Sequence, residues 1–197
     1  MTKARLIIFF FLGLIKVHGQ IPVAPDTSFS VYSAYTKAAK QYPGISIAAE
    51  IHLKEIKEEK DIVYCDLNGR KLLTDVFRPA DKNKINSIAI IIIHGGGWRS
   101  GKRAMHYPLA QRLATLGYTC FTPEYRLSTE AVFPAAVFDI KAAIKWVKQN
   151  KFTYNIDTSK TVLLGFSAGG KEPAHRWAAD QCIFLRMEGI HPVLVFQ

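Results

Sequence analysis

Two short glycine-rich segments carry the residue types that could do chemistry. Ser167 lies in residues 165–170, Gly-Phe-Ser-Ala-Gly-Gly, directly after the apolar run 161–164. Residues 94–98, His-Gly-Gly-Gly-Trp, follow a second apolar run at 88–93. Glycines permit a turn sharp enough to hold a serine hydroxyl clear of a sheet. Uncovered backbone N–H groups at the end of the other strand suit a developing oxyanion, so the pair predicts nucleophilic attack on an acyl group.

The order of the two segments indicates a role for each. Ser167 is the expected nucleophile, and the backbone N–H groups of Gly96, Gly97 and Ala168 are the expected oxyanion hole. Either segment alone also fits a purely structural turn between a strand and a helix. Both together, each directly after a strand, favour an active site.

The combination of His-Gly-Gly-Gly ahead of Gly-x-Ser-x-Gly-Gly resembles the α/β-hydrolase family. The likeness runs over about residues 61–170 and is closest to secreted bacterial carboxylesterases, such as acetyl-xylan and feruloyl esterases. It also includes Glu124-Tyr125-Arg126, Phe133-Pro134-Ala135-Ala136 and Asn155-Ile156-Asp157. The resemblance implies an α/β-hydrolase fold and hydrolysis of small or polysaccharide-linked esters. It also implies that His94 and Gly95 support the oxyanion loop, while an Asp or Glu and then a His follow Ser167 along the chain.

Strand and helix signals alternate up to the nucleophile, which favours a mostly parallel sheet with helices on both faces. A hairpin is expected around Asn68-Gly69, and an apolar helix face is expected from Val137, Ile140, Ile144 and Val147. The expected strands are 61–67, 71–77, 88–93, 118–121 and 161–165, and the expected helices are 30–41, 104–116 and 134–150. Arg126 and Asp139 are expected to form a buried structural pair.

The chain divides into four expected parts. Residues 1–19 have Lys3 and Arg5 ahead of an apolar run too short to span a bilayer, which is typical of a cleaved secretory signal. A retained anchor is the alternative. Residues 20–60 form an N-terminal extension, 61–170 the α/β-hydrolase core and 171–197 an atypical tail. The expected location is therefore secreted or periplasmic, without membrane attachment after cleavage.

The agreement with the family stops after Gly170. Pro173 would interrupt the helix that normally follows the nucleophile turn. His175, Asp180 and His191 are the remaining His or Asp residues beyond Ser167, and none fits the family pattern. We therefore expect a C-terminally truncated or frame-shifted fold, with missing strands beside the nucleophile strand and incomplete cover on 88–93. Weak esterase activity follows, and the alternatives are a non-catalytic ester- or glycan-binding relative or an incompletely folded fragment.

Composition narrows the possible partners. The formal charge is +10, but the basic residues are scattered and form no stripe with interleaved aromatic residues, so no nucleic-acid partner is expected. Cys65, Cys120 and Cys182 show no metal-binding spacing, and the first two are expected to be inert thiols in strands. No metal and no cofactor are expected. The sequence does not indicate an oligomeric state.

Overall fold

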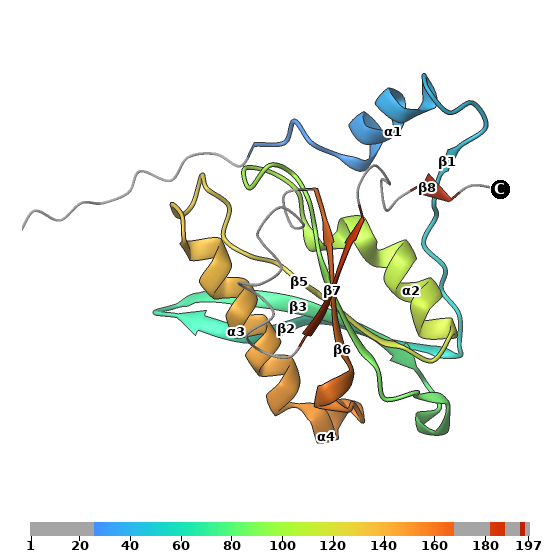
Figure 1. The fold of residues 1–197 in the computed structure, drawn as a ribbon, viewed down its shortest axis with the longest axis vertical. Coiled ribbons are helices and arrows are strands. Elements are labelled where there is room, and N and C mark those ends of the chain that lie inside the picture. The colour runs from blue at the N-terminus through green and yellow to red at the C-terminus, as the bar shows by residue number, and fades with distance from the viewer. Residues whose placement is uncertain (1–25, 168–181, 188–193, 196–197) are drawn as a thin grey trace, which may run out of the picture.

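The computed structural model describes residues 26–167, 182–187 and 194–195, and its main feature is a six-stranded sheet (Figure 1). The strand order is β2-β3-β5-β4-β6-β7, and β1 and β8 form a separate antiparallel pair. The strands are β1 Ser46–Ile47, β2 Ile56–Leu67, β3 Arg70–Pro79, β4 Ala89–Ile93, β5 Thr119–Pro123, β6 Thr161–Phe166, β7 Cys182–Met187 and β8 Leu194–Val195. The helices are α1 Val31–Ala39, α2 Tyr107–Thr115, α3 Ala135–Gln149 and α4 Lys151–Tyr154, with 3-10 turns η1 Lys82–Lys84, η2 Arg103–His106 and η3 Thr158–Lys160.

The antiparallel edge of the sheet is the predicted hairpin. Strands β2 and β3 pair over their length and are joined by Asn68 and Gly69, whose φ values are 52° and 95°. Left-handed backbone at both positions matches the twist of a two-residue hairpin, which explains the preference for Asn-Gly. The hairpin begins at Ile56, so its first residues come from the segment that the sequence assigned to the N-terminal extension.

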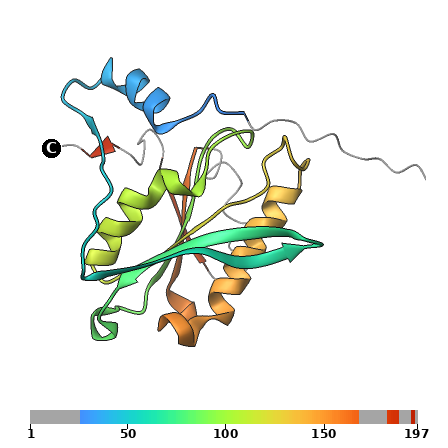
Figure 2. The same ribbon diagram turned by 180° about the vertical axis from the view of Figure 1, so that it is seen from behind.

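Strand β4 lies at the centre of the parallel part, between β5 and β6, and its five residues are all buried. Ala89, Ile91 and Ile93 pack with the apolar face of α3, whereas Ile90 and Ile92 pack with residues of α2. Figures 1 and 2 show these two helices on opposite sides of the sheet. The expectation that one face of this strand lacks cover is therefore wrong, because each face has its own helix.

The helices follow the sequence pattern, with one change of boundary. The predicted apolar face of α3 is buried at all four positions, namely Val137, Ile140, Ile144 and Val147. Ser30 caps α1 by accepting a hydrogen bond from the Ser33 N–H. The helix expected over 104–116 begins only at Tyr107, because residues 103–106 form the 3-10 turn η2, and Pro108 lies in the first turn of α2.

The strand beside the nucleophile strand is present. Strand β7 pairs in parallel with β6 over six residues, from Thr161↔Cys182 to Phe166↔Met187. The expectation that such strands are missing from the tail is therefore wrong. It depended on the loss of family pattern after Gly170, although Cys182–Met187 reads Cys-Ile-Phe-Leu-Arg-Met, an apolar run that suits a strand.

Candidate active site

Ser167 directly follows β6, and its backbone has a φ of 50°. This left-handed conformation costs an L-residue roughly 1–2 kcal/mol, because Cβ approaches the following carbonyl oxygen. The residue is exposed, whereas Phe166 before it is buried in the core. The turn thus presents a strained, accessible serine at the carboxyl end of the sheet, where open α/β sheets form their sites.

Gly95 brings the second glycine segment into contact with this serine. Ile93 of β4 pairs with Gly165 of β6, so both segments leave the sheet at the same edge. A Cβ added at Gly95 would lie 2.9 Å from the Phe166 carbonyl oxygen and 3.2 Å from the Ser167 Cβ. Only a residue without a side chain permits so close an approach. The two segments that the sequence singled out therefore touch.

Gly96 and Gly97 turn the loop that follows, with φ values of 124° and 63°. The Gly96 carbonyl accepts hydrogen bonds from the Ser100 N–H at 3.0 Å and the Ser100 hydroxyl at 2.8 Å. Within the described part of the chain, the N–H groups of Gly96 and Gly97 donate to no acceptor. They remain available as oxyanion donors next to Ser167. The third expected donor, Ala168, lies outside the described residues.

The buried side chain of His94 stabilises this loop. Its Nδ1 lies 2.8 Å from the Gly95 carbonyl oxygen, which can only accept, so the ring proton resides on Nδ1. The ring stacks on Tyr125 at a centroid distance of 4.3 Å, and the Tyr125 hydroxyl donates to the His94 carbonyl at 2.9 Å. Burial lowers the pKa of His94 to about 4. A buried, neutral ring bonded to its own loop supports backbone geometry rather than proton transfer.

Trp98 and Gly101 complete the loop. The ring centroids of Trp98 and Tyr125 lie 5.5 Å apart. The backbone carbonyl of Trp98 accepts a 2.7 Å hydrogen bond from the Ser128 N–H. A Cβ at Gly101 would lie 2.2 Å from the Gly95 carbonyl oxygen and 2.6 Å from the His94 Nδ1. Trp98 thus packs within the loop, and Gly101 lets the loop fold back onto its own start.

Asp139 and Arg126 form the predicted pair. The carboxylate of Asp139 is 2% exposed and accepts two guanidinium hydrogen bonds from Arg126, at 2.9 and 2.7 Å, together with one from the Arg126 N–H. These bonds raise the pKa of Arg126. The pair joins α3 to the segment after β5, which carries Tyr125 against the oxyanion loop.

Substituting Asp139 with alanine should lower the free energy of unfolding by about 3 kcal/mol. This is the lower part of the range for breaking a buried pair, since Arg126 is partly solvated and can be hydrated. Lys145→Ala is the matched control, because Lys145 lies exposed on the same helix and should change stability by no more than about 0.5 kcal/mol. Chemical denaturation measures both, and equal values would show that the pair contributes nothing.

A second buried carboxylate was not foreseen from the sequence. Asp75 in β3 is fully buried and lies 2.8 Å from the Arg103 Nε. Its oxygens also accept from the Asp61 N–H at 2.8 Å and from the Tyr107 hydroxyl. Arg103 and Tyr107 come directly after the oxyanion loop, so this cluster holds the far end of the loop on the sheet. Nothing in local spacing links these residues, which meet only through the strand register.

His106 is the other residue that the sequence did not single out. It is buried and stacks on Phe166, the residue before Ser167, with ring centroids 4.5 Å apart. Neither ring nitrogen has a hydrogen-bond partner among the described residues. Burial, followed by the proximity of His94, lowers the pKa of His106 to about 3. The His106 ring therefore stays neutral, and it packs flat against Phe166, next to the turn at Ser167.

Several features that the sequence predicted lie outside the described residues. These are His175, Asp180, His191 and the signal expected at 1–19. Within the described part, no hydrogen bond joins Ser167 to a histidine, and no group of three or more His, Cys, Asp or Glu side chains could hold a metal ion. None of the helices among those same residues is long and apolar enough to cross a membrane.

The strand order, the nucleophile turn after β6 and the glycine loop after β4 define an α/β-hydrolase, as the resemblance implied. Within this class, the chain belongs to the BD-FAE family, whose family model matches residues 74–174. That range includes both glycine segments, Asp75 and the pair formed by Arg126 and Asp139.

Similar proteins are named as esterases. Esterase LipQ of Mycobacterium tuberculosis is 34% identical over 120 residues, which cover 60% of this chain and 28% of LipQ. Arylesterase of Saccharolobus solfataricus is 33% identical over 88 residues, covering 44% of this chain and 29% of that protein. The solved structure of native esterase 2 from Thermogutta terrifontis has 30% identity and a TM-score of 0.52, covering 65% of this chain and 42% of that one. The same enzyme phosphonylated by cyclosarin gives a TM-score of 0.54 at 27% identity, covering 64% and 55%. The chain therefore spans little more than a quarter of these curated relatives and about half of these solved chains.

Proposed function

We propose that this protein is a serine-dependent carboxylic ester hydrolase that attacks its substrate through Ser167. One observation carries the proposal: a strained, accessible serine touches Gly95, and the N–H groups of Gly96 and Gly97 beside it have no acceptor in the described part of the chain. Attack by the hydroxyl on an ester carbonyl places negative charge on the carbonyl oxygen, which these donors can stabilise. Loss of the alcohol leaves an acyl-serine, and water then releases the acid.

The substrate class follows from the same geometry and from the relatives. An oxyanion hole with a serine serves esters in general, and the relatives are named esterase, carboxylesterase and arylesterase. We propose small esters or esters linked to a polysaccharide, in line with the family resemblance of the glycine segments. Among the residues described, neither a histidine base nor its acidic partner is joined to Ser167. The proposed activity is therefore modest.

Hydrolysis of p-nitrophenyl acetate by the purified protein tests the proposal. Without an oriented imidazole, the oxyanion donors and binding supply only about 10³–10⁴ over water, which is still measurable. Ser167→Ala should reduce the rate to background, whereas Ser128→Ala should leave it unchanged, because Ser128 is an exposed serine on a neighbouring loop. A fluorophosphonate should label the parent and the Ser128 variant but not the Ser167 variant.

The rival function is binding without turnover. Its support is the lack of any hydrogen bond between Ser167 and a histidine in the described residues. Equal background rates for the parent and Ser167→Ala, with no phosphonate labelling, would overturn the hydrolase and favour either a non-catalytic binding protein or an incompletely folded fragment.

We also propose that the protein is exported, on the pattern of residues 1–19. N-terminal sequencing of protein recovered outside the cytosol should begin at Gln20, and an intact Met1 on that material would contradict cleavage.

A further inference from the structure

Strand β2 contains a bulge opposite a buried carboxylate. Two of its residues, Lys60 and Asp61, stand opposite the single residue Asp75 of β3, where the register of the pair shifts. Asp61 has a φ of 57° there, a conformation uncommon for a residue other than glycine. Bulges bend a strand and redirect its side chains, and they are frequent next to active sites. The extra residue and its strained backbone indicate a role beyond strand pairing.

Both bulge residues contact the segment that follows the oxyanion loop. The Asp61 carboxylate pairs with the Arg103 guanidinium, and the Asp61 N–H donates to the Asp75 carboxylate at 2.8 Å. The Lys60 ammonium lies 3.4 Å from the centroid of the Tyr107 ring, which is a cation–π contact. Arg103 begins η2 and Tyr107 directly follows it, so the bulge contacts η2 at both ends.

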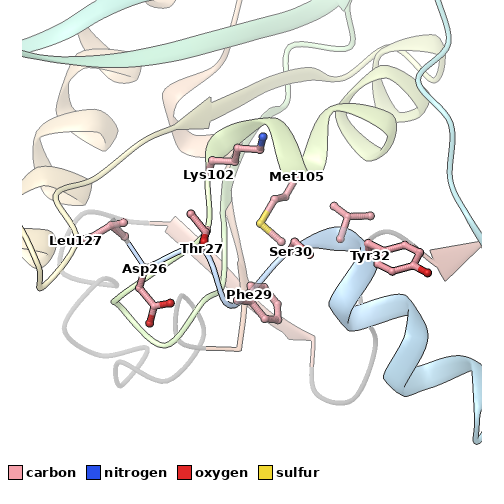
Figure 3. Close-up of a pocket in the computed structure, with 10 residues that line it drawn as sticks. Asp26, Thr27, Phe29, Ser30, Tyr32, Lys102, Met105 and Leu127 are labelled. Carbon is pink, nitrogen blue, oxygen red and sulfur yellow. The ribbon is translucent and has the colours of Figure 1, made fainter. Parts of the chain in front are cut away.

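The faces of η2 differ in how well they are packed. Side chains three residues apart in a 3-10 turn share a face. Arg103 and His106 thus share one face, which contacts strands β3 and β6 of the sheet. Lys102 and Met105, labelled in Figure 3, instead line a pocket of about 480 Å³. Because packing on the pocket side is incomplete, the contacts on the sheet side fix where η2 lies.

The position of η2 is transmitted to the nucleophile by two contacts. Gly101 lies two residues before Arg103, and a Cβ there would be 2.2 Å from the Gly95 carbonyl oxygen. Gly95 is in turn packed against Ser167, since a Cβ at Gly95 would lie 3.2 Å from the Ser167 Cβ. At the other end of η2, the His106 ring stacks on the residue before Ser167. A shift of η2 therefore displaces the oxyanion loop relative to the serine.

We propose that Asp61 is a positioning residue for ester hydrolysis, acting through Arg103 on the N–H groups of the oxyanion loop. The inference rests on the proposed hydrolase for its effect on rate, whereas its effect on the loop can be measured without turnover. Asp61 lies outside residues 74–174, the range that the family model matches, whereas Asp75 and Arg103 lie inside it. Asp61 therefore adds one contact to a pair in the matched part of the chain.

Glycine at position 61 provides the test. Asp61→Gly removes the carboxylate, keeps the N–H that donates to Asp75, and adopts a φ of 57° without strain. Asn68→Gly is the matched control, because Asn68 is an exposed residue of the same hairpin with a φ of 52°. Asp61→Asn is the conservative variant, since its amide oxygen can still accept a hydrogen bond from Arg103. Circular dichroism checks that all three variants fold like the parent.

Amide hydrogen exchange, measured by NMR, reports on the loop without any substrate. The N–H groups of Arg99 and Ser100 donate to the Gly96 carbonyl and close the turn of the loop. Asp61→Gly should accelerate the exchange of both amides about fivefold, which is the upper end for a partly exposed ion pair. Asn68→Gly should leave the exchange unchanged, and Asp61→Asn should give an intermediate rate.

Two further measurements separate positioning from general stability. Exchange in the buried strand β4 should stay at the parental rate in every variant, because the effect on the loop is local. In hydrolysis of p-nitrophenyl acetate, Asp61→Gly should lower kcat about fivefold at an unchanged KM, since oxyanion donors stabilise the transition state rather than the bound ester. Asn68→Gly should keep both constants, and Asp61→Asn should recover part of kcat.

The two proposals fail in different ways. Faster loop exchange in Asp61→Gly, without ester hydrolysis by the parent, would overturn the hydrolase and keep the positioning of the loop. Serine-dependent hydrolysis with an unchanged kcat in Asp61→Gly would overturn the positioning role and keep the hydrolase. Unchanged loop exchange, or equally accelerated exchange in β4, would also overturn the positioning role.

Discussion

Replacing Gly96 with alanine should reduce ester hydrolysis by at least ~10²-fold and lower the free energy of unfolding by roughly 2–4 kcal/mol. The added Cβ would lie 2.1 Å from the Ser100 carbonyl oxygen and 2.5 Å from the Ser100 carbonyl carbon, at a φ of 124°. Both neighbours are backbone atoms, so no side chain can rotate away. The turn that aims the Gly96 and Gly97 N–H groups must therefore open.

Gly97→Ala is the matched control for this prediction. Its φ is 63°, but a Cβ there meets nothing within 4 Å, so the expected cost is only the backbone term of about 1–2 kcal/mol. Thermal and chemical unfolding of the two variants, with hydrolysis measured in parallel, separates crowding from backbone strain. Equal unfolding free energies would show that the loop relaxes around the methyl group and that crowding at Gly96 is unimportant.

Lowering the pH from 6.5 to 4.5 should reduce the free energy of unfolding by about 4.5 kcal/mol through two buried histidines. In the unfolded chain each imidazole binds a proton near its ordinary pKa of 6.5, whereas burial lowers the pKa of His94 to about 4 and that of His106 to about 3. The unfolded state thus binds more protons throughout this window, and stability rises with pH. The contribution is complete above pH 6.5 and falls by up to about 1.4 kcal/mol per histidine for each pH unit below it.

The pH prediction is tested by urea unfolding at several pH values between 4.5 and 6.5, above the range where carboxylates dominate. His106→Phe keeps a ring against Phe166 and should reduce the pH slope by about half. His52→Phe is the control, because the His52 side chain is 75% exposed, and it should keep the parental slope. A flat profile in the parent would mean that both rings find proton acceptors or solvent, contrary to their burial.

The core of the fold and both halves of the site could be predicted because their signals are local. The uniformly apolar run at 88–93, the spacing of the apolar face of α3 and the Asn-Gly turn each reflect the geometry of one element. Ser167 and Gly95 could be brought together because parallel strands end at a common edge. The pair of Arg126 and Asp139 could be predicted because opposite charges lie on neighbouring parts of the chain, the segment after β5 and helix α3.

The remaining features depend on register and on distant packing. Asp75 meets Arg103 only because β3 pairs with β5 and the oxyanion loop ends above that pair, and no spacing in the sequence encodes this. His106 becomes unusual only when α2 and Phe166 enclose it. Strand β7 lies beyond the part of the chain that resembles the family, so its short apolar run is the one local signal for it.

Strand β4 has a consequence for how the protein assembles during synthesis. Its neighbours on the two sides are β5, which follows within thirty residues, and β6, which is complete only at residue 166. Pairing over such sequence separations must offset a large loop-closure entropy and is slow compared with local helix formation. The nascent chain therefore exposes one edge of an all-apolar strand until the nucleophile strand emerges and docks. The docking of β6 then completes the hydrophobic layer and forms the turn at Ser167 in one event. Before that event, the ribosome-bound chain exposes the most apolar surface for a chaperone to bind.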